Sequence, residues 1–140
     1  MHTSRREIEI EWGDCDPAGI VFYPRFFAAF DTSTSRLLEA ATGLRKSELI
    51  RANGIIGWPM VDTRARFLRP ASFGDETTIE TKVVKLGQSS FELVHRLSLA
   101  GAVCVEGWET RVWAAADGQG GIKGVPIPED LTQRLRSKCV

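Results

Sequence analysis

The chain opens with a short stretch in which hydrophobic and polar positions alternate. Ile8, Ile10 and Trp12 fall on one face of an extended segment, and three glutamates fall on the other. A period of two residues is typical of a strand with one buried face, so residues 6–12 are predicted to form a strand. A loop that contains proline and glycine follows.

The period changes at Pro24, where apolar residues begin to recur at helical spacing. Proline suits the first turn of a helix because the N–H it lacks would have no partner there, and Gly43 is a natural end. We therefore expect a helix of about five turns from Pro24 to Gly43, and a second, shorter helix over residues 46–52. Six apolar side chains share one arc of the long helix: Phe26, Phe27, Phe30, Leu37, Leu38 and Ala41.

Most of the remaining chain is predicted to be strand. Alternating or β-branched stretches cover residues 60–68, 77–86, 91–99 and 103–115, and turns containing glycine, serine or proline separate them. Because short connections join antiparallel neighbours, these four strands are expected to form a meander. The pattern also predicts a loop over residues 118–124 and a closing helix over residues 128–138.

This order of elements predicts one α+β domain over residues 1–140, in which an antiparallel sheet wraps one long helix. A chain of this length is expected to remove about two thirds of its unfolded surface from water. One helix covers only part of such a sheet. The tryptophans of segment 103–115 therefore suggest that a second subunit covers the rest.

Composition narrows the possible functions. Eighteen basic and eighteen acidic residues cancel, so the chain lacks the basic surface of a nucleic-acid-binding protein. No apolar run approaches the roughly 20 residues of a membrane span, and no signal peptide is predicted. The three cysteines, Cys15, Cys104 and Cys139, are odd in number and far apart, which favours reduced thiols in the cytoplasm.

The segment GDCDPAGIVFYP carries the most distinctive chemistry of the chain. Asp14 and Asp16, beside proline and glycine, are ordinary turn-forming residues. An Asp-x-Asp pair can also begin a calcium loop, but the later ligands of such a loop are missing. Neither His2 nor His95 belongs to a recognisable ligand cluster, so no metal is expected. His95 shares its row with apolar residues and is predicted to be structural, and Cys15 a packing thiol.

A catalytic interpretation joins Asp16 to Tyr23, at the start of the long helix. The first N–H groups of a helix lack an intrahelical partner and lie at the positive end of the helix dipole. Such an N–H can hold a developing oxyanion, and losing one donor of this kind typically costs about 2.7–4 kcal/mol. A nearby carboxylate can attack a carbonyl or activate water. The chain has no G-x-S-x-G motif and no convincing Cys/His pair, which leaves Asp16 as the best candidate.

The stretch GDCDPAGIVFYPRFF, followed by Asp31 and GIIGWPMVDTRARFLRPASFGDE, resembles the hot-dog-fold acyl-CoA thioesterases, above all the 4-hydroxybenzoyl-CoA thioesterase family. The likeness runs from about Glu7 to Ala115. It implies a long helix wrapped by a five-stranded antiparallel sheet, and a dimer of dimers with active sites at subunit interfaces. It also implies hydrolysis of an aromatic acyl-CoA thioester to the acid and CoA, with no metal and no cofactor, since coenzyme A is part of the substrate.

The resemblance assigns roles to individual residues. It places the catalytic carboxylate on Asp16 and the amide that polarises the carbonyl on Tyr23. It places the family's acyl-contacting carboxylate on Asp31, for which a solvated or salt-bridged group is the alternative. Thr34 either helps to bind the acyl group or bonds back to the helix backbone. Trp58 stands where the hydroxybenzoyl enzyme has a small polar residue near the acyl pocket. It either reshapes that pocket or belongs to the core.

The chain departs from the hydroxybenzoyl enzyme at residues 87–89, which lack the basic run that binds the nucleotide phosphates. Two other functions stay open: a thioesterase for short or medium acyl-CoA or acyl carrier protein thioesters, and a non-catalytic acyl-CoA-binding module. Five basic residues are possible substitutes for the missing run: Arg64, Arg66, Arg69, Lys82 and Lys85.

Overall fold

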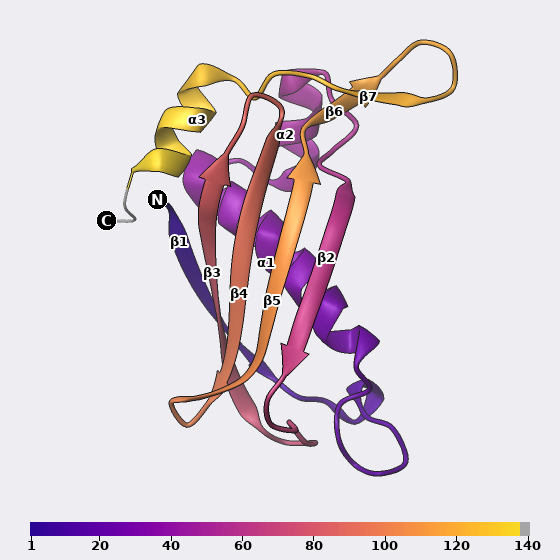
Figure 1. The fold of residues 1–140 in the computed structure, drawn as a ribbon, viewed down its shortest axis with the longest axis vertical. Helices are drawn as coiled ribbons and strands as arrows, with labels where there is room; N and C mark the ends of the chain where they lie inside the picture. The colour runs from indigo at the N-terminus through magenta and orange to yellow at the C-terminus, as the bar shows by residue number, and fades with distance from the viewer. Residues whose placement is uncertain (138–140) are drawn as a thin grey trace.

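The computed structural model describes residues 1–137, in which a sheet lies across one long helix (Figure 1). This arrangement confirms the predicted long helix wrapped by a five-stranded antiparallel sheet. The elements in chain order are β1 (Thr3–Glu9), the 3-10 turn η1 (Trp12–Asp14), α1 (Pro24–Thr42), α2 (Lys46–Asn53), β2 (Met60–Phe67), β3 (Glu76–Leu86), β4 (Ser90–Leu99), β5 (Ala102–Val112), β6 (Ala114–Ala116), β7 (Ile122–Gly124) and α3 (Glu129–Arg136).

The strands of the main sheet lie in the order β1-β3-β4-β5-β2, and every neighbouring pair is antiparallel. The predicted four-strand meander was wrong for β2, which pairs with β5 at the far edge instead of with β3. The connection between β2 and β3 is no tight turn. Its Leu68 and Arg69 N–H groups donate to the Cys104 carbonyl, and its Ala71 carbonyl accepts the Val21 N–H. These bonds hold the connection in place where it crosses the end of the sheet.

The first strand ends earlier than the alternation predicts. Trp12 begins η1 and has 68% of its surface exposed, because the Asp14 carboxylate accepts the Glu11 N–H at 3.0 Å and turns the chain. The Trp12 ring packs edge-on against Phe73 instead of entering the core. The last long strand also divides: β5 ends at Val112, and β6 pairs with β7 in a hairpin over the segment predicted to be a loop.

The helix predictions are confirmed within a residue or two. Pro24 opens α1, and Gly43 ends it in the left-handed region at φ +73°, where the absence of a Cβ removes the steric cost. The predicted closing helix corresponds to α3, and Lys138 and Cys139 lie outside the described residues. Cys15 and Cys104 are free thiols, as predicted.

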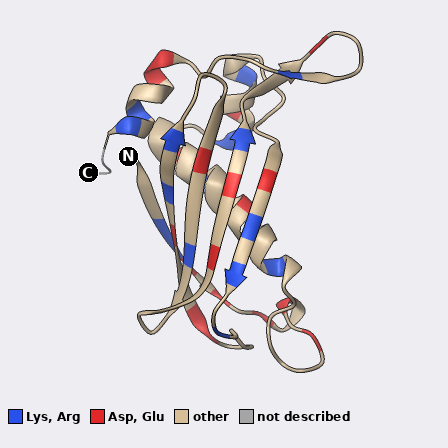
Figure 2. Cartoon of the chain, viewed as in Figure 1, with Lys and Arg blue, Asp and Glu red and all other residues tan. Residues whose placement is uncertain are grey.

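The core has two clusters, one on each half of α1. In one of them Trp58 and Trp113 stack with ring centroids 5.8 Å apart, beside Leu131 and Leu135 of α3. Trp113 is therefore covered by its own chain, whereas Trp108, on the other face of β5, is only partly buried. Charges of both signs are spread over the strands (Figure 2).

The inner face of β5 lies against α1 and is unusual in composition. Its buried row runs Val105, Gly107, Glu109, Arg111 and Trp113, with two charged residues between apolar ones. A Cβ on Gly107 would come within 2.6 Å of the Phe30 ring, so glycine allows that ring to approach the strand closely. Phe30 in turn stacks on His95 at 4.8 Å with nearly parallel planes.

Candidate active site

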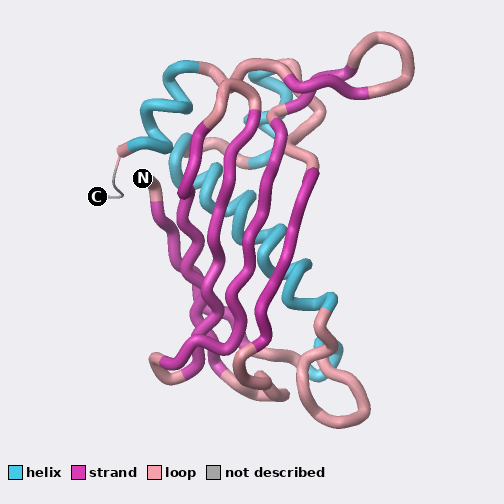
Figure 3. The backbone as a smooth tube through the Cα atoms, in the orientation of Figure 1, coloured by secondary structure: helices cyan, strands magenta, loops and turns pink. Residues whose placement is uncertain are grey.

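The loop between η1 and α1 is a small hairpin at the end of the sheet, beside the start of the long helix (Figure 3). Cys15 and Val21 form a β-bridge, and the Phe22 N–H donates to the Asp14 carbonyl at 2.8 Å. A second bridge joins Ile20 to Ser72 in the connection between β2 and β3. The hairpin is thus tied to the sheet on one side and continues directly into α1 on the other.

Asp14 and Asp16 have separate tasks in this hairpin. The Asp14 side chain caps η1, so its predicted turn-forming role is confirmed. Asp16 lies near the tip, where its Oδ1 accepts the Ala18 N–H at 2.8 Å and its backbone N–H donates to the Ile20 carbonyl. The Asp16 side chain is half-buried and held at one oxygen. This leaves the other oxygen of a fixed carboxylate for chemistry.

The start of α1 has one unused amide. Pro24 has no N–H, the Arg25 N–H donates to the Phe22 carbonyl, and the Phe26 N–H donates to the Tyr23 carbonyl. No hydrogen bond within residues 1–137 uses the N–H of Tyr23. An unpaired N–H at the positive end of a helix can stabilise a negative oxygen.

Tyr23, Phe27 and Asp31 are spaced four residues apart and therefore lie along one stripe of α1. Tyr23 and Phe27 both contact the Phe67 ring of β2, at centroid distances of 6.3 and 6.4 Å. A cavity of about 280 Å³ lies beside Tyr23 and is lined mainly by apolar residues, among them Phe67 and Leu68. The stripe faces the edge strand β2, where Phe67 is half exposed.

Asp31 is salt-bridged, which was one of the two alternatives for this residue. Its Oδ1 accepts the Arg111 Nη2–H at 2.8 Å. The Asp31 side chain is 54% exposed, whereas that of Arg111 is 5% exposed, so the bond joins the surface of α1 to the inner face of β5. No hydrogen bond of the described residues uses the second oxygen of Asp31.

Arg111 also binds Glu109, which is almost fully buried. Arg111 Nη2 lies 2.7 Å from Glu109 Oε1, and Arg111 Nε lies 3.3 Å from Oε2. Burial alone would lower the pKa of Arg111, but the hydrogen bond and charge of Glu109, together with those of Asp31, outweigh it and raise that pKa. The two buried charges therefore neutralise each other as an ion pair.

Three further residues complete this network around Glu109. Thr34 Oγ1 donates to Glu109 Oε2 at 2.9 Å, and His95 Nε2 lies 3.1 Å from the same oxygen. On its other side, His95 Nδ1 lies 2.8 Å from Thr81 Oγ1. Since a carboxylate only accepts, His95 donates from Nε2, and its Nδ1 is bonded to the Thr81 hydroxyl. The predicted structural role of His95 is confirmed: it is fully buried and hydrogen-bonded on both ring nitrogens.

The structure separates the predicted site residues into two groups. Asp16 and Tyr23 lie on one continuous segment at the helix start, and Asp31 lies two turns further along α1. Thr34 and Trp58 are fully or almost fully buried: the Thr34 side chain faces Glu109, and the Trp58 ring packs on Trp113. Of the two alternatives, Trp58 therefore belongs to the core. Its carbonyl accepts the Arg111 Nη1–H at 3.3 Å.

Sequence reasoning missed Glu109 and Arg111. The signal was available, because both fall on the same period-two row as the apolar residues Val105 and Trp113. Two charged residues on an apolar face of a strand indicate a buried pair or a site, since such groups are rarely buried unpaired.

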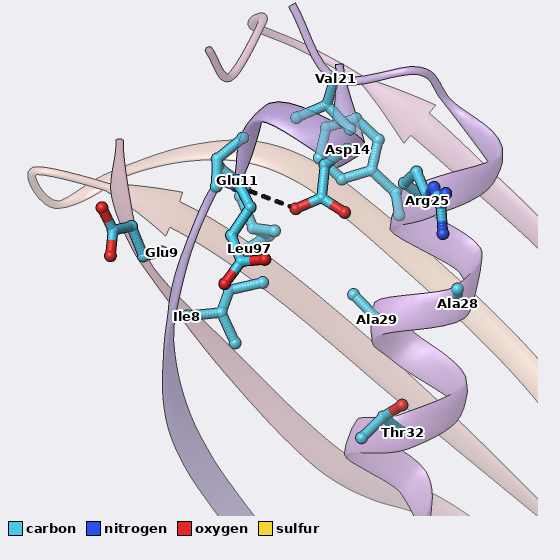
Figure 4. A pocket seen from close by; sticks show the side chains of 12 residues that line it. Ile8, Glu9, Glu11, Asp14, Val21, Arg25, Ala28, Ala29, Thr32 and Leu97 are labelled. Carbon is cyan, nitrogen blue, oxygen red and sulfur yellow. Dashed lines mark hydrogen bonds between the residues drawn. The ribbon is translucent and has the colours of Figure 1, made fainter. Parts of the chain in front are cut away.

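A second cavity, of about 430 Å³, lies between β1 and α1 (Figure 4). Asp14, Glu11 and Arg25 lie around it, and Ile8, Leu97 and other apolar side chains line its floor. Asp16 and Tyr23 do not line this cavity. Within residues 1–137, no group of three or more His, Cys, Asp or Glu side chains is arranged to hold a metal ion.

A long helix wrapped by a five-stranded antiparallel sheet is the hot-dog fold of thioesterases. Residues 10–135 match the thioesterase-like superfamily, and the chain belongs to this family. It is accordingly a thioester hydrolase. No helix of the described residues has both the length and the apolar character needed to cross a membrane.

Three relatives show the range of the family. The chain is 34% identical to the 4-hydroxybenzoyl-CoA thioesterase of Pseudomonas sp. strain CBS-3, over 89% of this chain and 91% of the relative. The solved structure of that enzyme superposes with a TM-score of 0.86, covering 94% and 98% of the two chains. A 1,4-dihydroxy-2-naphthoyl-CoA hydrolase of Synechococcus sp. strain WH7803 is 33% identical, over 71% and 69%. The structure of a gentisyl-coenzyme A thioesterase is 32% identical at a TM-score of 0.82, covering 94% and 99%.

The burial of Glu109 makes the stability of the fold depend on acidity. Desolvation raises the pKa of Glu109, but the hydrogen bonds and charges of His95 and Arg111 outweigh it and hold that pKa below its ordinary value of 4.5. As pH falls below that value, the unfolded chain takes up a proton at this position before the folded chain does. The free energy of unfolding therefore decreases as the solution is acidified through this range.

We predict that Glu109→Gln weakens this acid dependence. Urea unfolding between about pH 5 and about pH 3 should show a shallower loss of stability in the variant than in the wild type. At neutral pH the variant should be less stable by about 3–5 kcal/mol, because it leaves the buried Arg111 without its buried counter-charge and with only the half-exposed Asp31 as a partner. Glu106→Gln is the matched control, since Glu106 is more exposed and lies 3.7 Å from Arg96. An unchanged acid slope in Glu109→Gln would contradict the account.

Proposed function

We propose that the protein hydrolyses the CoA thioester of a hydroxylated aromatic acid, of the 4-hydroxybenzoyl type, to the free acid and coenzyme A. The observation that carries the proposal is the stripe of Tyr23, Phe27 and Asp31 on α1. It has an unused N–H at one end, an aromatic ring in the middle and an unused carboxylate oxygen at the other end. The three relatives are all named for a hydroxylated aromatic acyl group.

The dimensions of the stripe suit one aromatic ring. Asp31 lies eight positions after Tyr23, which corresponds to a rise of about 12 Å along the helix. Helical side chains lean toward the N-terminus, so the Asp31 carboxylate lies nearer to Tyr23 than its backbone does. A benzoyl carbonyl bonded to the Tyr23 N–H would place its ring over Phe27 and a para substituent near Asp31. A hydroxyl there would donate to the carboxylate.

The reaction needs a polarised carbonyl and a source of the attacking oxygen. In this proposal the Tyr23 N–H binds the thioester oxygen, which gains negative charge as the tetrahedral species forms. Asp16 supplies the second requirement in one of two ways. Its free oxygen either attacks the carbonyl carbon and forms an anhydride that water then cleaves, or it removes a proton from the attacking water. In both cases the C–S bond breaks, and CoA leaves as the thiol.

The apolar cavity beside Tyr23 offers a path for the rest of the substrate. Arg69 lines this cavity, which makes it the best supported of the five basic residues suggested for the nucleotide phosphates. Arg64 instead lies over the Trp108 ring, 4.1 Å from its centroid. In this proposal, Arg69 contacts the nucleotide phosphates.

A second copy of the chain is proposed to cover the edge strand β2 and complete the site. The β2 strand has an unpaired edge, and Val61 and Phe67 on it are 60% and 50% exposed. Exposed strand edges with apolar side chains are typical pairing surfaces. The Tyr23–Phe27–Asp31 stripe faces this edge, so the partner would close the open side of the acyl site. A dimer of two such dimers is the proposed assembly.

We predict that Asp16→Asn lowers kcat for 4-hydroxybenzoyl-CoA by about a hundredfold or more, because an amide neither attacks nor accepts a proton. Thiol release measures the reaction, and the melting temperature should stay close to that of the wild type, since the asparagine oxygen can still accept the Ala18 N–H. Asp14→Asn is the control: its oxygen still caps η1, so kcat should change only severalfold. Wild-type turnover in Asp16→Asn would remove Asp16 from the mechanism.

The acyl and carrier preferences are tested by thiol release from a panel of thioesters. The panel contains 4-hydroxybenzoyl-, benzoyl-, phenylacetyl- and hexanoyl-CoA, and 4-hydroxybenzoyl acyl carrier protein. We expect the highest kcat/KM for 4-hydroxybenzoyl-CoA, at least about tenfold above benzoyl-CoA, because benzoyl leaves the Asp31 carboxylate without its donor. Preference for hexanoyl-CoA or for the carrier protein would contradict the proposed substrate. Binding of CoA without release from any thioester would contradict catalysis.

Light scattering tests the proposed assembly. The wild type is expected to show at least twice the mass of one 15.5 kDa chain. Val61→Asp should lower that mass and the activity together, because it places a charge on the pairing edge. Val84→Asp is the control, since Val84 is also exposed but lies on the internal strand β3. A wild type with the mass of one chain would refute the assembly.

A further inference from the structure

We propose that Arg111 is a positioning residue for acyl-group specificity: anchored by Glu109, it holds the Asp31 carboxylate so that Oδ2 stays open to a donor at the far end of the acyl group. The inference rests on the proposed function and extends it from Asp31 to the buried residues behind it. Arg111 itself does not touch the substrate in this account. It acts by fixing the direction of Asp31.

The guanidinium of Arg111 has little freedom. It contacts Glu109 through Nε and Nη2, the Trp58 carbonyl through Nη1, and Asp31 through Nη2. A guanidinium is planar and its donors have fixed directions, so these bonds together set its orientation. Any rotation would leave a buried charge unpaired.

Glu109 is held just as firmly. The Thr34 hydroxyl and the His95 Nε2–H donate to it from α1 and β4, while both Arg111 donors reach it from its own strand. His95 is fixed in turn by the Thr81 hydroxyl and by stacking on Phe30. The one buried side-chain nitrogen or oxygen without a partner among the described residues is His2 Nε2, which lies outside this network. The whole network is thus satisfied and rigid.

A buried ion pair is weak evidence of a contribution to the stability of a fold. Replacing a buried ion pair by apolar residues of similar volume is often neutral or stabilising. The pair therefore costs desolvation that Leu or Met at the same positions would avoid. An apolar pair could not hold a carboxylate on the surface of α1. Within residues 1–137, the Arg111–Asp31 bond is the one that joins the buried network to an exposed side chain.

The consequence for recognition follows from charge and geometry. A half-exposed aspartate on a helix would otherwise sample several rotamers, and binding would have to order it. With Oδ1 held at 2.8 Å by Arg111, Oδ2 is ordered before the substrate arrives. Oδ2 of the Asp31 carboxylate therefore presents a negatively charged hydrogen-bond acceptor at this position. The site therefore favours a hydroxyl or amino group at this position and disfavours an anionic one.

The test measures the discrimination ratio, defined as kcat/KM for 4-hydroxybenzoyl-CoA divided by kcat/KM for benzoyl-CoA. Arg111→Lys keeps the positive charge but cannot bond Glu109, the Trp58 carbonyl and Asp31 in one plane. We expect it to lower the ratio about tenfold, as expected for a weakened hydrogen bond to a charged group. Arg96→Lys is the matched control, because Arg96 is exposed and pairs with Glu106 at the surface; its ratio should be unchanged.

Coupling to Asp31 separates positioning from a structural effect. Asp31→Asn should lower the ratio, and Arg111→Lys added to it should lower it no further. If Arg111→Lys does not fold, Glu109→Leu/Arg111→Met provides the same test with an apolar core, and its ratio should match that of Asp31→Asn.

Two outcomes overturn the role of Arg111 and leave the proposed substrate standing. In the first, Arg111→Lys and Glu109→Leu/Arg111→Met both keep the wild-type ratio while Asp31→Asn lowers it. In the second, adding Arg111→Lys to Asp31→Asn lowers the ratio further. A wild type without preference, or an Asp31→Asn variant with the wild-type ratio, overturns the proposed substrate and this inference together.

Discussion

The structure depends on one constraint: two opposite charges on the inner face of β5 must be satisfied where water does not reach them. Glu109 and Arg111 pair with each other, and their other hydrogen bonds within the described residues involve Thr34 and Asp31 of α1, His95 of β4 and the Trp58 carbonyl. An unsatisfied buried charge would cost far more than the pair gains. The helix α1 can therefore pack against the sheet in only one register. Gly107 leaves room at this contact for the Phe30 ring, which stacks on His95.

That register also determines where the reactive groups lie. Phe26 and Phe30 anchor the first turns of α1 in the core, so the helix start and its unused Tyr23 N–H are fixed relative to the sheet. The hairpin that carries Asp16 is tied to the same end by the Val21–Ala71 bond. Asp31, two turns along, takes its direction from Arg111. The proposed polarising amide, the proposed nucleophile or base, and the proposed substituent contact are thus all positioned relative to one helix.

Much of this arrangement was predictable from the sequence, and the rest was not for identifiable reasons. Pro24 and Gly43 bound α1 because proline and glycine act locally, and the period of two located β3, β4 and β5. The position of β2 depends on which strand it pairs with, and a strand pattern carries no information about its partner. Trp12 lies outside the first strand and is exposed, because the Asp14 carboxylate accepts the Glu11 N–H and turns the chain there. Asp31 was a candidate by resemblance, but its partner lies 80 residues away in the sequence.

The most direct test is a crystal structure with a nonhydrolysable analogue of 4-hydroxybenzoyl-CoA, a thioether that keeps the carbonyl group. The account predicts that the carbonyl oxygen accepts the Tyr23 N–H, that Asp16 faces the carbonyl carbon, and that the ring hydroxyl donates to Asp31 Oδ2 while Oδ1 stays on Arg111. An acyl group bound instead in the cavity between β1 and α1, with the Tyr23 N–H unused, would contradict it.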